Sequence, residues 1–463
     1  MTLVKQTSLE KTNNKTPNKF WGKVAKFLSS DKLIHIVCFL SVLFIGADLF
    51  SFEVFDVTVR YEQVLLVVFA LLLYRKGEFS LSHNIFMWLF CLTTLCSVFF
   101  AYNLKRSAIF YFAIVYNLIF VFFLFSSYVR IYGLKKFIEI FRYTIMLQVF
   151  FVAVQSVVKV AFEYDFPFFS NYGAFRGVYR FCIWFYEPSY YATHMIFGFA
   201  LALYMLAFAR DFSYIFDIFA IALGLVMSTA STGIVGMGIA VVVVFFIYAV
   251  TGWKKILASK HYAIKIILKT LSLIAFCMAP IFGLFLISRF FPEMYNVYIQ
   301  RMFDDPVSAM GGRVEMWQEV IKVFKQFPVF GVGPGCYGLF VSNDNSIIPS
   351  NVTLELLSTT GVLSTLLFYA ITVYFIVRCA KCAKKYGTRS DKLVFGCALA
   401  LLVFTLVLQA NQSYIRLYHW MFLGILQGAL ERYDCKIRLF SRKRLWGIPA
   451  TVGLKSKFIT KKK

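Results

Sequence analysis

Residues 231–250 read STGIVGMGIAVVVVFFIYAV and contain no charged side chain. A helix needs about twenty mostly apolar residues to cross a bilayer, so this stretch predicts a transmembrane helix. It belongs to a longer apolar run, 212–250, which the small residues STASTG at 228–233 divide into two predicted helices. Runs of the same kind recur along the chain, and we predict about twelve spanning helices in all.

The other predicted spanning helices have the same apolar character. They cover residues 33–50, 57–74, 84–102, 108–128, 137–161, 188–209, 266–288, 352–377, 393–410 and 413–430. The composition agrees, because 60% of the residues are hydrophobic and 15% are charged, whereas a soluble domain is nearer half apolar and a quarter charged. No Pro/Gly/Ser-rich linker interrupts the chain. We therefore expect one all-α integral membrane domain, residues 33–430, between basic tails at 1–32 and 431–463.

The positive charges indicate how the chain crosses the membrane. The formal net charge is +25, but Lys and Arg form short clusters between apolar runs rather than one basic face, which argues against a nucleic-acid partner. Such clusters stay on the cytoplasmic side. They lie in the two tails and at Arg75-Lys76, at Arg130 with Lys135-Lys136, at Lys254-Lys255 with Lys260, and between Arg378 and Lys392. The sequence thus predicts a multi-pass plasma-membrane protein with both termini in the cytoplasm, with Lys105-Arg106 as an exception on the outside.

The cysteines do not indicate a metal site or a disulfide framework. Most of the ten lie inside apolar runs, where cysteine acts as a small buried hydrophobe. Cys379 and Cys382 form one CxxC pair in a basic connection, but a structural zinc site needs about four ligands and no second pair is near. We predict no metal and no cofactor.

Two predicted outer loops are long, at about 162–187 and 289–350. Within the second, Val314, Trp317, Ile321 and Phe324 recur at helical spacing. This pattern predicts an amphipathic helix that lies along the outer membrane surface with its Trp and Phe face toward the lipid.

Arginines collect on these outer loops and on the outer ends of helices, against the usual bias. They are Arg176, Arg180, Arg289, Arg301, Arg313 and Arg416. Because a guanidinium binds phosphate oxygens in two-pronged fashion, the set suggests an anionic, phosphate-bearing ligand at the outer face. The alternative is that they pair with lipid headgroups or with the nearby carboxylates Glu163, Asp165, Glu293, Asp304 and Asp305.

Glu187 and His194 are candidates for proton transfer. Glu187 precedes Pro188 where the first long loop enters a helix, and His194 follows seven residues later near the same helical face. The alternatives are that Glu187 caps the helix and that His194 is a packing residue.

Three segments carry a family resemblance. They are RVEMW at 313–317, FPVFGVGPG at 327–335 and NVTLELLSTTGVL at 351–363. With Arg180, the Glu187-Pro188-Ser189 triplet and the Ser/Thr-Gly break at 231–233, they resemble the O-antigen polymerase and ligase superfamily over roughly residues 176–430. The resemblance implies a GT-C-like membrane glycosyltransferase of the bacterial inner membrane that uses undecaprenyl diphosphate as carrier and leaving group.

Two departures from the family pattern bear on the branch. In the ligase branch an Arg commonly stands at the break and a His precedes the Asn, whereas this chain has Thr232 and Ser350. We therefore expect an O-antigen or other surface-polysaccharide polymerase of the Wzy type, in lipopolysaccharide biosynthesis, rather than a ligase. A lipid-linked oligosaccharide flippase is a further alternative, but it predicts repeated halves, which this chain lacks.

The resemblance implies roles for single residues in a metal-independent transfer. Arg313 with Arg180 or Arg176 would neutralise the departing diphosphate, and Glu187 would be the base. The predicted substrate-binding residues are Arg176, Arg289, Arg301, Arg416, His194, Trp317, Tyr337, Asn351 and Glu355. For Trp317, Tyr337 and the loop around Trp184, membrane anchoring and packing are the alternatives to stacking on sugars. Expected partners are the undecaprenyl diphosphate-linked oligosaccharide, membrane lipid and a chain-length regulator.

Overall fold

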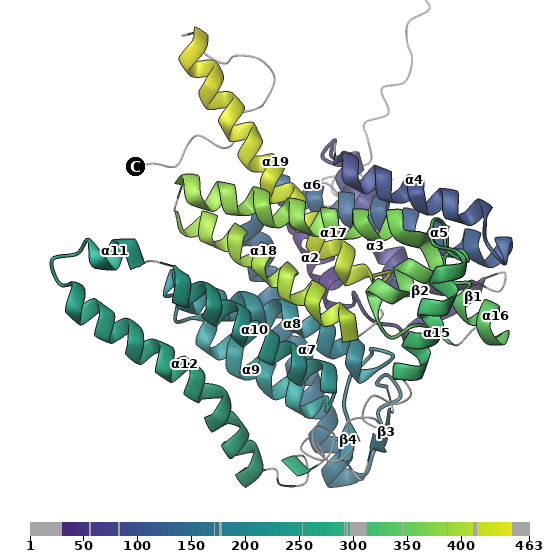
Figure 1. The fold of residues 1–463 in the computed structure, drawn as a ribbon, viewed down its shortest axis with the longest axis horizontal. Coiled ribbons are helices and arrows are strands. Elements are labelled where there is room, and N and C mark those ends of the chain that lie inside the picture. The colour runs from purple at the N-terminus through teal and green to yellow at the C-terminus, as the bar shows by residue number, and fades with distance from the viewer. Residues whose placement is uncertain are drawn as a thin grey trace, which may run out of the picture.

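The computed structural model describes residues 30–54, 57–81, 84–170, 172–175, 178–251, 253–290, 292, 295–296, 313–344, 347–386, 388–410 and 414–446. In this part of the chain the fold is all-α, as predicted, apart from two short β-hairpins (Figure 1). The elements are, in chain order, α2 (Asp31–Leu43), β1 (Ser51–Val54), β2 (Val57–Arg60), α3 (Tyr61–Arg75), α4 (Ile85–Phe99), α5 (Leu104–Asn117), η1 (Leu118–Phe123), α6 (Leu124–Tyr132), α7 (Leu134–Phe162), β3 (Tyr172–Phe175), β4 (Val178–Arg180), α8 (Pro188–Tyr204), η2 (Met205–Ala209), α9 (Tyr214–Met227), α10 (Ser231–Val250), α11 (Trp253–Leu257), α12 (Tyr262–Phe290), α15 (Arg313–Gln326), α16 (Tyr337–Ser342), α17 (Val352–Tyr386), α18 (Arg389–Val407), η4 (Leu408–Ala410) and α19 (Leu417–Trp446).

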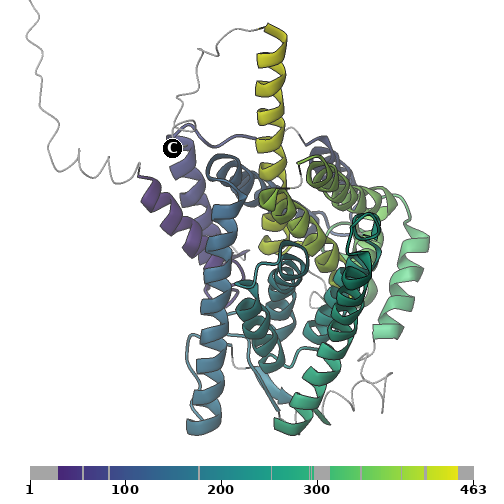
Figure 2. The same ribbon diagram turned by 90° about the vertical axis from the view of Figure 1, so that its left-hand side faces the viewer.

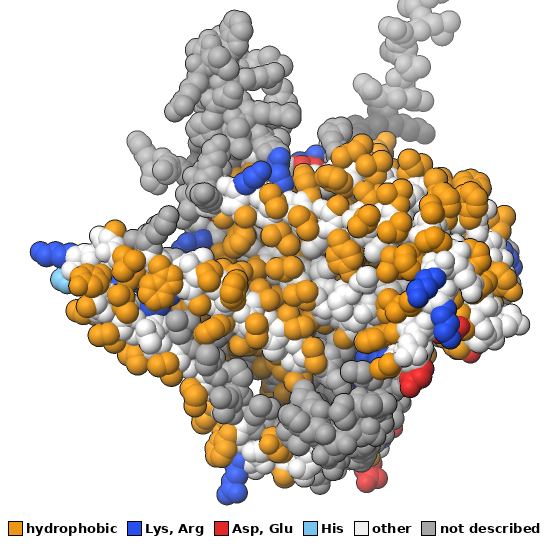
Figure 3. All heavy atoms as spheres, viewed as in Figure 1, with side chains coloured by type: hydrophobic (Ala, Val, Ile, Leu, Met, Phe, Trp, Pro, Cys, Tyr) orange, Lys and Arg blue, Asp and Glu red, His pale blue; other side chains and the backbone are white. Residues whose placement is uncertain are grey.

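Every predicted apolar run contains a helix. Six of the described helices are long and apolar enough to cross a membrane: 104–132, 134–162, 188–209, 231–250, 352–383 and 389–410. The break predicted at 228–233 is present, since α9 ends at Met227 and α10 begins at Ser231. Apolar side chains cover the face seen in Figure 3, and the Lys and Arg side chains lie at its rim. The protein is therefore a multi-pass membrane protein, while the number of twelve crossings stays a prediction.

Polar side chains begin several helices. Asn84 accepts a hydrogen bond from the backbone N–H of Phe86, and Asn103 accepts one from Arg106 at 3.0 Å. Thr388 and Asp391 form a reciprocal capping box at the start of α18. Such caps satisfy N–H groups that have no partner within the helix, so they fix where each helix starts.

Two predicted helix ends differ from the structure. The first helix was expected to reach residue 50, but α2 ends at Leu43 and the chain turns toward the β1–β2 hairpin. Gly46 permits this path, because an added Cβ would lie 2.1 Å from the Phe185 ring. At the other end, α19 continues to Trp446, beyond the predicted limit of 430, and its last part projects past the neighbouring helices (Figures 1 and 2).

Contacts join the connections that were predicted to share one side. Among the inner ones, Lys76 bonds with Asp31 and Tyr132, and Arg130 lies 3.8 Å from Glu431. In Figure 1 the elements of the predicted outer side, β1, β2, α15 and α16, lie on the right, whereas α11 lies at the far left. The predicted alternation of connections between the two sides of the membrane stays a prediction.

The innermost part of the bundle is formed by α8, α18 and α19. Nearly all residues of α8 are buried, and the rings of Phe197 and Phe422 stack with centroids 3.8 Å apart. The long helix α7 stands along one side of the bundle, which Figure 2 shows as a blue column. Because α8 starts at Pro188, this packing fixes the position of Glu187 just before it.

Candidate active site at the predicted outer end

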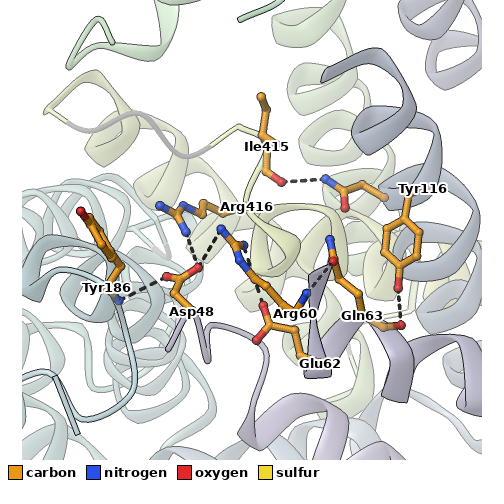
Figure 4. Close-up of polar contacts among 9 residues, drawn as sticks. Asp48, Arg60, Glu62, Gln63, Tyr116, Tyr186, Ile415 and Arg416 are labelled. Carbon is orange, nitrogen blue, oxygen red and sulfur yellow. Dashed lines mark hydrogen bonds and ion pairs between the residues drawn. The ribbon is translucent and has the colours of Figure 1, made fainter. Parts of the chain in front are cut away.

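An ion cluster lies where the first hairpin, the start of α8 and the start of α19 meet (Figure 4). The carboxylate of Asp48 is 2.6 Å from Nη1 of Arg416 and 3.0 Å from Nη2 of Arg60. A second carboxylate, that of Glu62, is 3.9 Å from Nη1 of Arg60. The side chains of Asp48 and Glu62 are buried, with exposed fractions of 5% and 1%. We call Asp48, Arg60, Glu62 and Arg416 the ion cluster.

The ion cluster touches both sides of Glu187. Asp48 Oδ2 accepts a hydrogen bond of 3.3 Å from the backbone N–H of Tyr186. On the other side, the guanidinium of Arg416 lies 3.7 Å from the ring centroid of Tyr190, in the first turn of α8. Glu187 itself is half-buried, and one of its carboxylate oxygens accepts a hydrogen bond from Ser189 at 2.9 Å.

Arg180, a predicted catalytic residue, lies in the same neighbourhood. Burial raises the pKa of the Cys182 thiol to about 12. The positive charge of Arg180 opposes this rise, while Glu187 and Asp48 add to it. Arg180 ends β4 two residues before Cys182. The contacts of Tyr186 and Tyr190 bring Asp48 and Arg416 to the backbone on either side of Glu187. That these residues form one catalytic site stays a prediction.

Glu355 and Asn351 approach this site from α17. Asn351 accepts a hydrogen bond from the Leu354 N–H and donates one to the Gln409 carbonyl at 2.8 Å. Glu355 is buried one turn later, where the charge of Arg416 acts on it. One Glu355 carboxylate oxygen has no hydrogen-bond partner among the described residues.

His194 lies deeper in the bundle than Glu187. It is fully buried among Phe141, Phe185, Tyr418 and Phe422, whose ring centroids are 5.5–6.1 Å from the imidazole. Neither ring nitrogen has a hydrogen-bond partner in the described part of the chain. This aromatic surrounding fits the packing alternative better than contact with a polar substrate.

The amphipathic helix was predicted correctly in position, since α15 spans Arg313–Gln326. Its packed face differs from the expected one. Val320 and Val323 are buried with Tyr337, and Met316 packs against them, whereas Ile321 of the predicted face is 43% exposed. The reason is that α15 packs against α17 and against the glycine-rich turn that follows α15. This contact buries the face that carries Val320 and Val323.

The remaining predicted residues lie on other elements. Arg313 and Trp317 are half-buried on the first turns of α15, and Tyr337 is buried, which raises its pKa to about 12. Arg289 is exposed near the end of α12. Arg176, Arg301, Glu293, Asp304 and Asp305 fall outside the described residues. Of the other carboxylates proposed as arginine partners, Asp165 pairs instead with Lys159 at 2.7 Å.

The glycine-rich turn at 327–335 docks onto a break in α17. At Gly361 the backbone leaves the helical conformation, with φ 78° and ψ −179°. The carbonyls of Ser358 and Thr359 are thereby free to accept bonds of 2.8 and 2.9 Å from the N–H groups of Val332 and Gly333. The Val362 N–H returns a bond of 2.9 Å to the carbonyl of Pro328.

Two further side chains fasten this turn. Ser97 of α4 bonds with the carbonyls of Phe330 and Thr359. Arg106, the outer exception to the charge rule, donates from Nε to the Gly335 carbonyl. Two of the three sequence segments that carry the resemblance are therefore bound to each other through their backbones.

This docked pair falls inside a known family match. Residues 216–369 match the family model described as O-antigen ligase. The chain carries an O-antigen ligase family domain. The match confirms the superfamily predicted from residues 313–363, and no curated protein matches the chain. The O-antigen ligase family domain contains Arg289, Arg313, Trp317, Tyr337, Asn351 and Glu355 but excludes Arg180, Glu187 and Arg416.

Three members of the ion cluster were missed from the sequence. Asp48, Arg60 and Glu62 lie at the outer ends of the first two predicted runs, 33–50 and 57–74, where charged residues commonly mark the ends of spanning helices. The available signal was that Arg60 is another arginine at a predicted outer helix end, like those already singled out.

Proposed function

We propose that the protein is a surface-polysaccharide polymerase of the bacterial inner membrane, with both termini in the cytoplasm. It transfers a growing glycan from undecaprenyl diphosphate onto a lipid-linked repeat unit at the outer face. The observation that carries this proposal is the position of Glu187. It lies directly before the central helix α8 and is half-buried, and its neighbours Tyr186 and Tyr190 contact the ion cluster. The O-antigen ligase family domain supports the same class of reaction.

The proposed reaction is a substitution at the anomeric carbon of the growing chain. A hydroxyl oxygen of the incoming repeat unit forms the new glycosidic bond, and the bond to the diphosphate oxygen breaks. The hydroxyl proton passes to the carboxylate of Glu187. The diphosphate leaves with an added negative charge, which Arg180 and Arg313 neutralise. In this proposal the positive charges of the two arginines stabilise the leaving diphosphate in place of a metal ion.

Ligase activity is the second candidate, because the matching family is described as O-antigen ligase. The polymerase proposal rests on two positions that differ from the ligase branch. Thr232 is buried in the first turn of α10, and Ser350 directly precedes the cap residue Asn351. Neither side chain ionises near neutral pH, so neither can replace an arginine or a histidine base.

The test uses purified protein in proteoliposomes supplied with lipid-linked repeat units. We expect wild type to form longer lipid-linked glycans with this single substrate, whereas a ligase requires a separate lipid acceptor. Arg313→Ala is expected to abolish elongation, and Glu187→Gln to slow it by about a hundredfold or more. Lys322→Ala is the matched control, since Lys322 is exposed on the same helix and pairs with Glu319.

The outcomes separate the roles. Glycans of normal length from Arg313→Ala would remove its leaving-group role. Normal elongation by Glu187→Gln would exclude Glu187 as the base. Product from wild type only when a separate lipid acceptor is present would replace polymerase with ligase.

A further inference from the structure

Asp48 holds three segments that are far apart in the sequence. Its carboxylate contacts Arg60 at the end of the first hairpin, Arg416 before α19 and the Tyr186 N–H before α8. The backbone next to it adds a further link, because the Leu49 N–H donates to the Trp184 carbonyl at 3.3 Å. The turn that follows α2 is thus bound directly to the loop that ends at Glu187.

Arg416 holds the other side of the same loop. Its guanidinium stacks on Tyr190, whose backbone N–H donates to the Glu187 carbonyl at 3.0 Å. A guanidinium over an aromatic ring, paired with a buried carboxylate, is a restrained arrangement. Contacts on Tyr186 and Tyr190 therefore constrain the backbone immediately before and after Glu187.

The guanidinium of Arg416 is already engaged by groups of the protein. It lies 2.6 Å from the buried carboxylate of Asp48 and 3.7 Å from the ring centroid of Tyr190. Arg60 shares the same carboxylate at 3.0 Å. A diphosphate that approached Arg416 would have to compete with a carboxylate that is already in place. Arg416 is therefore better suited to hold the protein than to hold the leaving group.

We propose that Asp48 and Arg416 are positioning residues that form a clamp on the segment around Glu187 and aim its carboxylate at the acceptor hydroxyl. This inference rests on the proposed role of Glu187 in polymerisation. Asp48 lies between α2 and β1, outside the O-antigen ligase family domain at 216–369. The N-terminal helices are consequently part of the catalytic architecture and not only a membrane anchor.

The first measurement reports on the clamp without using activity. Backbone amide hydrogen exchange across residues 184–191 is compared for wild type and Asp48→Asn in lipid nanodiscs. We expect faster exchange there in Asp48→Asn, because an uncharged amide loses the pairing with Arg416 and weakens the bond from Tyr186. Asp165→Asn is the control, since Asp165 forms an exposed ion pair with Lys159 in the long loop after α7. Its exchange across 184–191 is expected to equal wild type.

The second measurement separates positioning from binding. Initial elongation rates are recorded against the concentration of lipid-linked repeat units. For Asp48→Asn we expect kcat to fall by about tenfold to a hundredfold with KM nearly unchanged, as when a reacting group is slightly misplaced. Asp48→Glu, which keeps the charge, is expected to recover part of kcat. Arg416→Lys keeps the ion pair with Asp48 but loses the flat stacking on Tyr190. This variant replaces Asp48→Asn in both measurements if Asp48→Asn does not fold.

Direct binding of undecaprenyl diphosphate completes the test. The clamp predicts unchanged affinity in Asp48→Asn. A changed affinity with unchanged kcat would overturn it and make Arg416 a diphosphate ligand. Unchanged exchange together with unchanged kcat would overturn it as well. Faster exchange at 184–191 in a protein whose wild type does not elongate glycans would support the clamp and refute the polymerase function.

Discussion

Gly361→Ala is expected to destabilise the protein strongly, because the site rejects a side chain in two ways. Its φ of 78° with ψ of −179° is a conformation that essentially only glycine adopts, and an L residue there costs about 1–3 kcal/mol. An added Cβ would also lie 1.9 Å from the carbonyl oxygen of Val329. That atom is backbone, so relief requires the docked turn to move.

Moving the turn breaks the backbone bonds that hold it on α17. Three such bonds link residues 328–333 with residues 358–362, and each contributes about 1 kcal/mol net. Together with the backbone strain, we expect a loss of about 4–6 kcal/mol. At about 2 °C per kcal/mol for larger domains, the thermal midpoint should fall by roughly 8–12 °C.

The assay is the midpoint of thermal unfolding in detergent, followed by size-exclusion chromatography of heated samples. Gly238→Ala is the matched control, because Gly238 lies in α10 and an added Cβ would meet nothing within 4 Å. Alanine there should be neutral or stabilising by up to about 1 kcal/mol. Equal midpoints for the two variants would refute the docking of the turn on the helix break as a source of stability.

Two further predictions concern stability. Ser97→Ala removes the hydroxyl that bonds with the carbonyls of Phe330 and Thr359, so we expect a loss of about 1–2 kcal/mol in the same thermal assay; a midpoint equal to wild type would contradict the role of Ser97. The second concerns Asp31, whose pKa is lowered by the hydrogen bond from Lys76. A lowered folded-state pKa stabilises the protein above the unfolded pKa, and the contribution disappears as pH falls through the folded value. Asp31→Asn should therefore lower the midpoint more at pH 7 than at pH 3, and an equal effect at both pH values would exclude the ion pair as the cause.

The positions of the helices could be predicted because each follows from local composition. A run such as 231–250 has to be helical in lipid, since its backbone groups have no other hydrogen-bond partners there. The break at 228–230 and the helix at 313–326 were predictable for similar local reasons. The packed face of α15 was not, because two adjacent faces carry apolar residues and contact with α17 decides between them.

The candidate site could be predicted only in part. Glu187 and the arginines of the outer loops were suggested by their position relative to the apolar runs, and the stacking of Arg416 on Tyr190 places one of these arginines beside the segment that holds Glu187. The pairing of Arg416 with Asp48 could not be foreseen, because the two residues are 368 positions apart. The role of Gly361 could not be foreseen either. The family pattern includes this glycine but does not indicate that the turn at 327–335 packs against it.

Composition alone was enough to predict a membrane protein and the apolar runs that form its helices. Those properties depend on the solvent that each segment meets, and a segment carries that information in its own composition. The early end of α2, and with it the contacts of Asp48 with Arg416 and with the loop before Glu187, came only from tertiary packing. A buried charge is stable only beside its partner, and packing of the whole bundle selects that partner.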